Sequence, residues 1–187
     1  MLVSDIAHKA LIGGNWSLSP LYIRANLRAT ALEGEIYVVK DPVTSRIVSF
    51  GLWFAPGKAL FGSDEQKALG FNDFFNKLST ETQHWWTHTY PDTVRPFMAR
   101  IWTKEELGKR LYCFNLCTDP EHQNRGYATA IVDFAFEKAK RNGQILGLST
   151  SSDLNVRKYL SMGFRERGQT SLDAPTGGFP VHCFSRE

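Results

Sequence analysis

A short segment in the second half of the chain, Cys117 to Tyr127, has the composition of an anion-binding loop. It follows an apolar and aromatic run at 111–118, which predicts a buried strand, and it leads into a helix-forming run at 128–142. The unpaired N–H groups of a first helical turn and the positive end of the helix dipole suit a doubly charged pyrophosphate. Gly126 lets the backbone approach phosphate oxygens closely because it has no Cβ.

Three phosphate-binding motifs compete for this segment, and their residue requirements separate them. A Walker loop needs Gly-Lys-Ser or Gly-Lys-Thr, which the sequence lacks. A dinucleotide fingerprint needs three glycines spaced GxGxxG, whereas Gly126 stands alone between Arg125 and Tyr127. The third pattern, Gln/Arg-x-x-Gly-x-Gly/Ala, is satisfied by Gln123, Gly126 and Ala128. Binding of ATP or NAD through the same loop is therefore the disfavoured alternative.

The third pattern resembles the acyl-coenzyme A motif of the GNAT superfamily of N-acetyltransferases. A second signature of that superfamily, Asn-x-x-x-Tyr-x-x-x-Gly-Phe, is matched from Asn155 through Tyr159 to Phe164. This run follows an expected strand at 145–150, which is the order that the superfamily has. The resemblance covers 111–164.

The resemblance extends more loosely over 35–57. Within the superfamily, this segment and the aromatic helical insertion after it most resemble fungal proteins similar to puromycin acetyltransferase. The fold implied is a mixed α/β (α+β) domain with a mostly antiparallel central sheet flanked by helices. The strand before the pyrophosphate loop would splay from its neighbour and form the acyl-CoA site, with acetyl-CoA as co-substrate and no metal.

The cofactor contacts implied by the resemblance lie on the splayed strand, on the loop and on a later helix. The strand backbone would pair with the amide-bearing arm of coenzyme A, the amides of 124–129 would hold the pyrophosphate, and two loop side chains would add donors at the rim. These expected contacts are Leu116, Thr118, Gln123, Asn124, Arg125, Gly126, Tyr127, Ala128, Thr129 and Asn155.

Tyr159 is the expected catalytic residue. An amine that attacks a thioester places negative charge on the carbonyl oxygen and then expels a thiolate. A backbone amide near Leu116 to Thr118 would stabilise the first, and Tyr159 would protonate the second. A tyrosine with a pKa near 10 is a reasonable donor to a nascent thiolate. The alternative is that Tyr159 is only a core aromatic on an amphipathic helix.

The sequence leaves the general base open, with Asp119, His122, Glu105 and Glu106 as candidates and no base needed for an acceptor of low pKa. The odd number of cysteines argues against a disulfide framework, so Cys113, Cys117 and Cys183 are expected as buried free thiols. A covalent acyl-cysteine at Cys117 is disfavoured because no adjacent base supports it.

The first half of the chain predicts helices around a hairpin. Segment 4–32 indicates two short helices separated by a turn, and no strand is evident before them. Runs 35–40 and 46–54 predict a strand hairpin. A capping box at Ser63 predicts a helix that must end before Pro91.

The helical insertion at 63–92 carries an aromatic stripe with two interpretations. Packing against the sheet is the simpler one. In the other, Trp85, Trp86 and Tyr90 line an acceptor pocket near the thioester, which would favour an apolar or aromatic amine. His84 and His88 lie four apart, but Trp85 stands where a zincin helix carries its glutamate, so a metal site is not expected.

The length of the chain predicts a single domain over 1–187. Two final strands are expected at 165–172 and 179–185. With 42% hydrophobic residues, 22% charged residues and a net charge of +3, the chain has neither a basic stripe for nucleic acid nor a long apolar run for a membrane. A cytoplasmic monomer or homodimer is expected.

The leading functional prediction is an acyl-CoA-dependent N-acyltransferase that acetylates a primary amine of a small molecule. The few residues after the last expected strand carry no protein-recognition module, which favours a small acceptor over a peptide or protein amine. A module that binds acyl-CoA without turnover is the alternative from another class, motivated by the missing first strand and the lack of a clear base.

Overall fold

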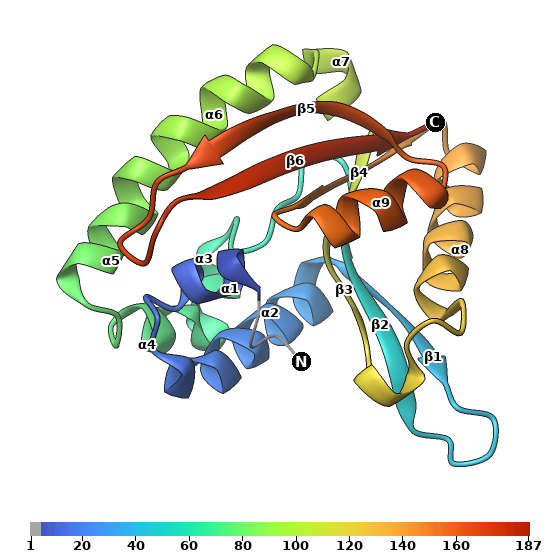
Figure 1. The fold of residues 1–187 in the computed structure, drawn as a ribbon, viewed down its shortest axis with the longest axis horizontal. Helices are drawn as coiled ribbons and strands as arrows, with labels where there is room; N and C mark the ends of the chain where they lie inside the picture. The colour runs from blue at the N-terminus through green and yellow to red at the C-terminus, as the bar shows by residue number, and fades with distance from the viewer. Residues whose placement is uncertain (1–4) are drawn as a thin grey trace.

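The computed structural model describes residues 5–187, and its centre is a single six-stranded mixed sheet (Figure 1). The strand order is β1-β2-β3-β4-β6-β5, in which only β3 and β4 run parallel. The strands are β1 (Glu35–Lys40), β2 (Ile47–Phe54), β3 (Arg110–Thr118), β4 (Ile145–Thr150), β5 (Arg165–Leu172) and β6 (Phe179–Arg186). The predicted strands are thus confirmed to within one residue at each end, and so is the mixed, mostly antiparallel sheet.

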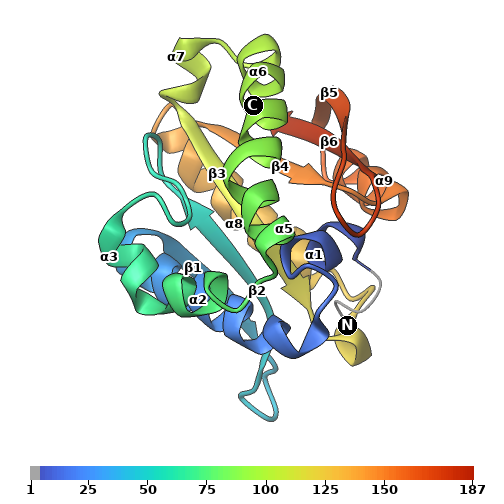
Figure 2. The same cartoon turned by 90° about the vertical axis from the view of Figure 1, so that its left-hand side faces the viewer.

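Helices cover both faces of the sheet. Figure 2 shows α1 and α6 on the near face and α8 behind the strands. The helices are α1 (Ile6–Leu11), α2 (Ser19–Glu33), α3 (Asp64–Gln66), α4 (Asn72–Phe75), α5 (Thr80–His84), α6 (Tyr90–Ile101), α7 (Lys104–Leu107), α8 (Tyr127–Arg141) and α9 (Asp153–Ser161). Helix α8 packs on β2, β3 and β4, whereas α2 packs on β1 and β2 and α6 packs on β5.

The main core lies between α8 and the middle of the sheet. Helix α8 buries an apolar stripe that includes Ile131, Val132 and Ala135 against Trp53 of β2 and Leu148 of β4. A second, aromatic cluster joins the N-terminal helices to the helical insertion. Its buried members are Ile12, Leu18, Tyr22, Phe74 and Leu78.

The N-terminal segment folds into a short and a long helix. Gly13 and Gly14 both have positive φ angles, 61° and 75°, which makes the expected turn. Pro20 lies in the first turn of α2, where its missing N–H removes no helical hydrogen bond. The predicted start at Ser4 lies outside the described residues, and no strand precedes β1 within 5–187.

The single helix predicted from Ser63 to before Pro91 is instead two helical stretches, of which the first ends at Phe75 and the second begins at Thr80 and continues through Pro91. Helical structure runs from α5 through a π-type segment at Trp85–Thr89 into α6, which contains both Pro91 and Pro96. The wider π turn shifts the backbone hydrogen bonds before Pro91. In addition, the Thr93 hydroxyl donates to the Thr89 carbonyl at 3.0 Å. The second helical stretch therefore extends past residue 92 to Ile101, and the short helix α7 follows it.

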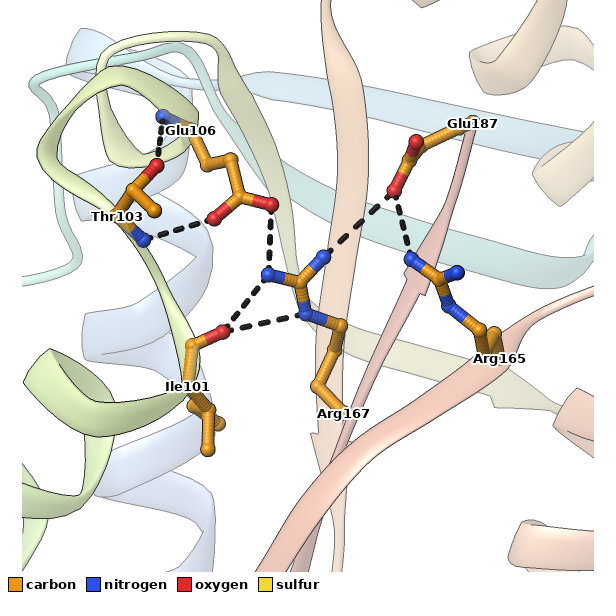
Figure 3. Close-up of polar contacts among 6 residues, drawn as sticks. All are labelled: Ile101, Thr103, Glu106, Arg165, Arg167 and Glu187. Carbon is orange, nitrogen blue, oxygen red and sulfur yellow. Dashed lines mark hydrogen bonds and ion pairs between the residues drawn. The ribbon is translucent and has the colours of Figure 1, made fainter.

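Arg167 of β5 joins the end of α6 to the sheet (Figure 3). Its guanidinium donates to the Ile101 carbonyl at 2.8 and 3.2 Å and to the Glu106 carboxylate at 2.6 Å. It also lies over the Trp102 ring, 4.6 Å from the centroid, and 3.6 Å from Glu187. Arg165 contacts the same Glu187 at 3.1 Å, but that pair is exposed.

None of the helices in residues 5–187 has the length and apolar character needed to cross a bilayer.

We expect Arg167→Ala to lower the free energy of unfolding by about 2 kcal/mol, because it leaves the Ile101 carbonyl and the half-buried Glu106 carboxylate without their donor. Urea denaturation followed by circular dichroism measures this. The matched control is Arg165→Ala, for which the exposed pair predicts a loss of no more than about 0.5 kcal/mol. Equal losses in the two variants would contradict the structural role of Arg167.

Candidate functional site

Strands β3 and β4 pair only over the first half of β3. Residues Arg110–Cys113 pair with Ile145–Leu148. Beyond this point β3 continues alongside β2 as far as Thr118, whereas the last two residues of β4 pair with β6. The sheet therefore divides at its centre into two halves, one of β1, β2 and β3 and the other of β4, β5 and β6. In Figure 1 these halves point in different directions.

A β-bulge in β3 marks the point of divergence. Leu52 of β2 faces Asn115, but the next residue, Trp53, faces Cys113, so Phe114 is the extra residue. A bulge bends its strand and increases the local twist, which turns the second half of β3 away from β4. The sequence carried no signal for this bulge, because Phe114 has the same apolar character as its neighbours in the strand.

The direction of the backbone groups in β3 follows from its pairing with β2. The Asp119 N–H donates to the Val48 carbonyl at 2.9 Å. Successive residues of a strand alternate in direction, so the Cys117 amide also faces β2, and those of Leu116 and Thr118 face the opening beside β4. In this register Ser49 and Thr118 are opposite residues whose backbones do not hydrogen-bond to each other, and the side chains of such non-hydrogen-bonded pairs lie close together. The 2.9 Å contact between their hydroxyls agrees with this.

The loop between β3 and α8 presents a row of free amides. Within residues 5–187, no acceptor pairs with the N–H groups of 124–129, and the first paired N–H of α8 is that of Ala130. Gly126 precedes the helix with φ 80°, and a Cβ built on it would meet no atom within 4 Å. The backbone is therefore open to a ligand at the positive end of a helix of 15 residues.

The loop side chains are held by the loop itself. The Gln123 amide donates to the Thr118 carbonyl at 3.3 Å, and the Arg125 guanidinium donates to the Glu121 carbonyl at 3.1 Å. Asn124 has a positive φ of 60°, which asparagine tolerates better than most residues. These contacts keep both long side chains close to the free amides.

A cavity of about 270 Å³ lies at the opening between β3 and β4. Its walls come from both sides of the sheet, because α1, α2 and α6 contribute residues from one side and α9 from the other. On the strands it is lined by residues 112–117 of β3 and 148–150 of β4. Apolar side chains from α6, β5 and β6 line much of the remainder, among them Val94, Phe97, Leu172 and Phe179.

Tyr159 and Asn155 of α9 both line this cavity. The Tyr159 ring packs on Phe164 and Phe184, with centroids 5.7 and 5.9 Å away. Its hydroxyl has no hydrogen-bond partner among residues 5–187. Burial raises the pKa of Tyr159, so the hydroxyl keeps its proton at neutral pH and can donate it.

The three aromatic residues proposed for an acceptor pocket have different positions. Tyr90 lines the cavity. Trp85 is buried, and its indole N–H donates to the Asp173 carbonyl, while the Trp86 indole donates to the Leu11 carbonyl at 2.9 Å. Neither tryptophan is among the residues that line the cavity, so their contacts favour the packing interpretation.

The four candidate bases from the sequence lie away from the cavity. Glu105 contacts Lys109 at 2.6 Å, and Glu106 contacts Arg167. Asp119 accepts the Glu121 N–H at 3.1 Å and lies 3.8 Å from the His122 ring. Each of these carboxylates therefore has a local structural contact.

The thiols are free, as predicted, and Cys113 and Cys183 are buried, whereas Cys117 is only half-buried. Burial raises the pKa of Cys117, which disfavours the thiolate that an acyl-cysteine would need. His84 and His88 stack with centroids 4.3 Å apart, but in the described part of the chain no three metal-binding side chains gather.

Two polar residues of the cavity were missed by the sequence analysis, His8 of α1 and Asn26 of α2. Both are buried. No motif surrounds either residue, and only the packing of the N-terminal helices over the opening brings them there.

The family comparison falls on the same region. Residues 93–166 match the model described as an acetyltransferase (GNAT) domain, a range that contains both sequence motifs. This part of the chain is therefore similar to GNAT acetyltransferase domains. GNAT acetyltransferases use acetyl-CoA, which fits the free amides and the open strand edge. No curated protein matches the sequence.

Solved structures with a similar fold include N-acetyltransferases of small amines. Arylalkylamine N-acetyltransferase 2 from Aedes aegypti has 15% identity and a TM-score of 0.56, covering 88% of this chain and 78% of that one. Polyamine N-acetyltransferase from Drosophila melanogaster has 11% identity and a TM-score of 0.53, covering 81% and 74%. A putative acetyltransferase from Agrobacterium tumefaciens has 20% identity and a TM-score of 0.38, and the match covers 42% of this chain and 56% of the length of that protein. The first two establish a likeness of fold.

We expect Gly126→Ala to weaken the binding of coenzyme A at least about tenfold, because the new methyl group lies where phosphate oxygens would approach the loop between β3 and α8. Gly143→Ala is the matched control. Gly143 also has a positive φ, 62°, and open space around it, but it lies at the far end of α8. Both variants should lose about 1 kcal/mol of stability from the left-handed backbone. Isothermal titration calorimetry would contradict the phosphate site if both variants bound coenzyme A equally well.

Proposed function

We propose that this protein is an acetyl-CoA-dependent N-acetyltransferase that acetylates a primary amine of a small molecule. The observation that carries this proposal is the cavity at the divergence of β3 and β4, where the free hydroxyl of Tyr159 meets the open edge of β3. The same strand leads from the cavity to the free amides of 124–129. One extended ligand with a diphosphate at one end and a reactive group at the other suits this arrangement.

Each part of the site has a role in this proposal. The backbone groups of Leu116 and Thr118 bind the amide-bearing arm as an added strand would. The amides of 124–129 bind the pyrophosphate, with Gln123 and Arg125 at its rim. Asn155 lies beside the arm. With the arm along β3 and the pyrophosphate at 124–129, the thioester of the bound cofactor would lie in the cavity, next to Tyr159.

The reaction follows from these positions. The amine nitrogen attacks the thioester carbonyl carbon, and the C–S bond breaks as the amide C–N bond forms. A β3 amide that faces the opening stabilises the negative charge on the carbonyl oxygen. Tyr159 donates its proton to the departing thiolate and regains one from the nitrogen of the new amide.

The walls of the cavity favour an acceptor with an apolar or aromatic body. Val94, Phe97 and Phe179 are apolar, and Asp5 is the one carboxylate among the lining residues that the structure describes. A polyamine with several positive charges would lack partners there. The small volume also suits a small molecule better than a peptide chain. A closer relationship to fungal proteins similar to puromycin acetyltransferase stays a prediction from sequence.

Two measurements test the proposed function. Isothermal titration calorimetry should show binding of acetyl-CoA but not of ATP or NAD. Release of free thiol should follow when acetyl-CoA is mixed with the protein and 2-phenylethylamine, and it should be slower with spermidine. Binding without thiol release for either amine would favour the non-catalytic acyl-CoA-binding module, and a lack of acetyl-CoA binding would contradict both functions.

Tyr159→Phe should lower kcat about 100-fold, a typical loss for a general acid, and leave the affinity for acetyl-CoA unchanged. Tyr37→Phe is the matched control, because Tyr37 is also a partly buried tyrosine packed on the main core but does not line the cavity. Initial rates of thiol release measure the effect. A Tyr159→Phe protein with normal kcat would show that Tyr159 only packs on its neighbours.

A further inference from the structure

The proposed acetylation needs a group that removes a proton from the acceptor. A primary amine is mainly an ammonium ion at neutral pH, and its nitrogen has no lone pair until that proton is lost. The inference below rests on the proposed function. The candidates from the sequence lie outside the cavity, so the base must be sought among its lining residues.

Most titratable groups of the cavity hold their protons at neutral pH. Burial raises the pKa values of Tyr22, Tyr90, Tyr112 and Tyr159. It also raises the pKa values of the three cysteines. A group that already holds its proton cannot accept another, so among the described lining residues two groups remain, Asp5 and His8.

Asp5 already has contacts that hold α1 in place. Its Oδ1 atom caps the helix by accepting the His8 N–H at 3.1 Å. The same atom lies 3.5 Å from the Ser151 hydroxyl, just beyond β4. These contacts connect α1 to the edge of the opening through Oδ1, which gives the Asp5 carboxylate a structural role.

His8 is a buried imidazole that lines the cavity. Its side chain is largely buried, with 6% of the residue exposed, and its ring lies 5.6 Å from the centroids of both Trp16 and Tyr22. The Nε2 atom is 2.8 Å from the Ser19 hydroxyl oxygen. When Nε2–H donates to Ser19, the lone pair of Nδ1 is free to accept a proton.

A second polar side chain that lines the same cavity has an unpaired acceptor atom. Asn26 is on α2, one turn after Tyr22, and it is 3% exposed. Its Oδ1 atom is buried and has no hydrogen-bond partner within residues 5–187, and the side chain lines the cavity. A buried carbonyl oxygen without a donor is unfavourable, and an ammonium or amine N–H of a ligand would satisfy it.

We propose that His8 is the general base of the acetylation and that Asn26 holds the acceptor amine beside it. The ammonium ion enters the cavity and donates one N–H to Asn26 Oδ1. His8 accepts one proton from it, directly or through one water, and releases that proton to solvent after the reaction. The neutral amine then attacks the thioester. The second proton lost from nitrogen reaches the thiolate through Tyr159, so the net products are the acetylated amine, the free thiol and one proton.

The groups that face His8 set the pH dependence. Burial lowers the pKa of the imidazole, and the Asp5 carboxylate opposes this shift. The other facing groups are Ser19, Trp16 and Tyr22, which carry no charge at neutral pH, and Tyr90 and Tyr159 across the cavity are neutral as well. His8 is therefore neutral and able to accept a proton at pH 7. Activity should fall as the pH falls through the lowered pKa, because the imidazole is then protonated.

The test compares kcat between pH 5 and 9 for wild type and His8→Gln, with acetyl-CoA and 2-phenylethylamine as probes. We expect kcat of His8→Gln at pH 7 to fall about 100-fold and the acid limb assigned to His8 to disappear, with unchanged affinity for acetyl-CoA. The exposed His84 provides the matched control, and His84→Gln should keep the wild-type profile. A His8→Gln profile that coincides with wild type would overturn the proposal.

Two further measurements keep the proposal testable if His8→Gln folds poorly. Free imidazole should restore part of the activity of His8→Ala, because it can occupy the vacated space, and a purely structural role would give no rescue. In wild type, the NMR titration of the His8 ring should give a pKa below 6.5, and a value above 7.5 would overturn the proposal. If wild type binds acetyl-CoA but acetylates neither probe amine, the proposed function itself is contradicted, and its base with it.

Discussion

The divergence of β3 from β4 is the constraint on which the rest of the site depends. A sheet whose central strands separate leaves backbone N–H and C=O groups without partners, and such groups are costly unless water or a ligand binds them. Here the Phe114 bulge creates the gap, while pairing with β2 keeps the exposed edge of β3 extended and rigid. The unpaired edge therefore holds a row of backbone donors and acceptors in fixed positions.

The two halves of the sheet are held apart by separate contacts. Hydroxyl and thiol contacts attach β3 to β2 through Ser49 and attach β4 to β6 through Ser149 and Cys183. Helix α8 spans the base of the opening with a stripe of small and branched residues that pack on both halves. On the opposite side the N-terminal helices and α6 lie over the opening, so that the gap in the sheet becomes a partly open cavity.

The local parts of the site could be predicted from the sequence, and the long-range parts could not. The strand, loop and helix around Gly126 are specified by neighbouring residues, so the motif placed them within one residue. The strands were also predictable, because β-branched and aromatic runs bounded by turn residues have few alternatives. Trp85 and Trp86 were ambiguous, since an apolar stripe does not reveal whether it covers a core or a pocket. His8 and Asn26 were missed because a lone buried polar residue has no periodic signal, and the π-type segment that accommodates Pro91 has no recognised sequence pattern either.

Residue-resolved NMR of the ¹⁵N-labelled protein, titrated with coenzyme A, tests most directly whether the divergence of β3 and β4 forms the cofactor site. The amides of Leu116 and Thr118 and those of 124–129 should show the largest chemical-shift changes and should become protected from hydrogen exchange. The amides of the β1–β2 turn at 41–46 should not change. Shifts of equal size in both regions, or changes confined to residues outside β3 and its loop, would contradict the site described above.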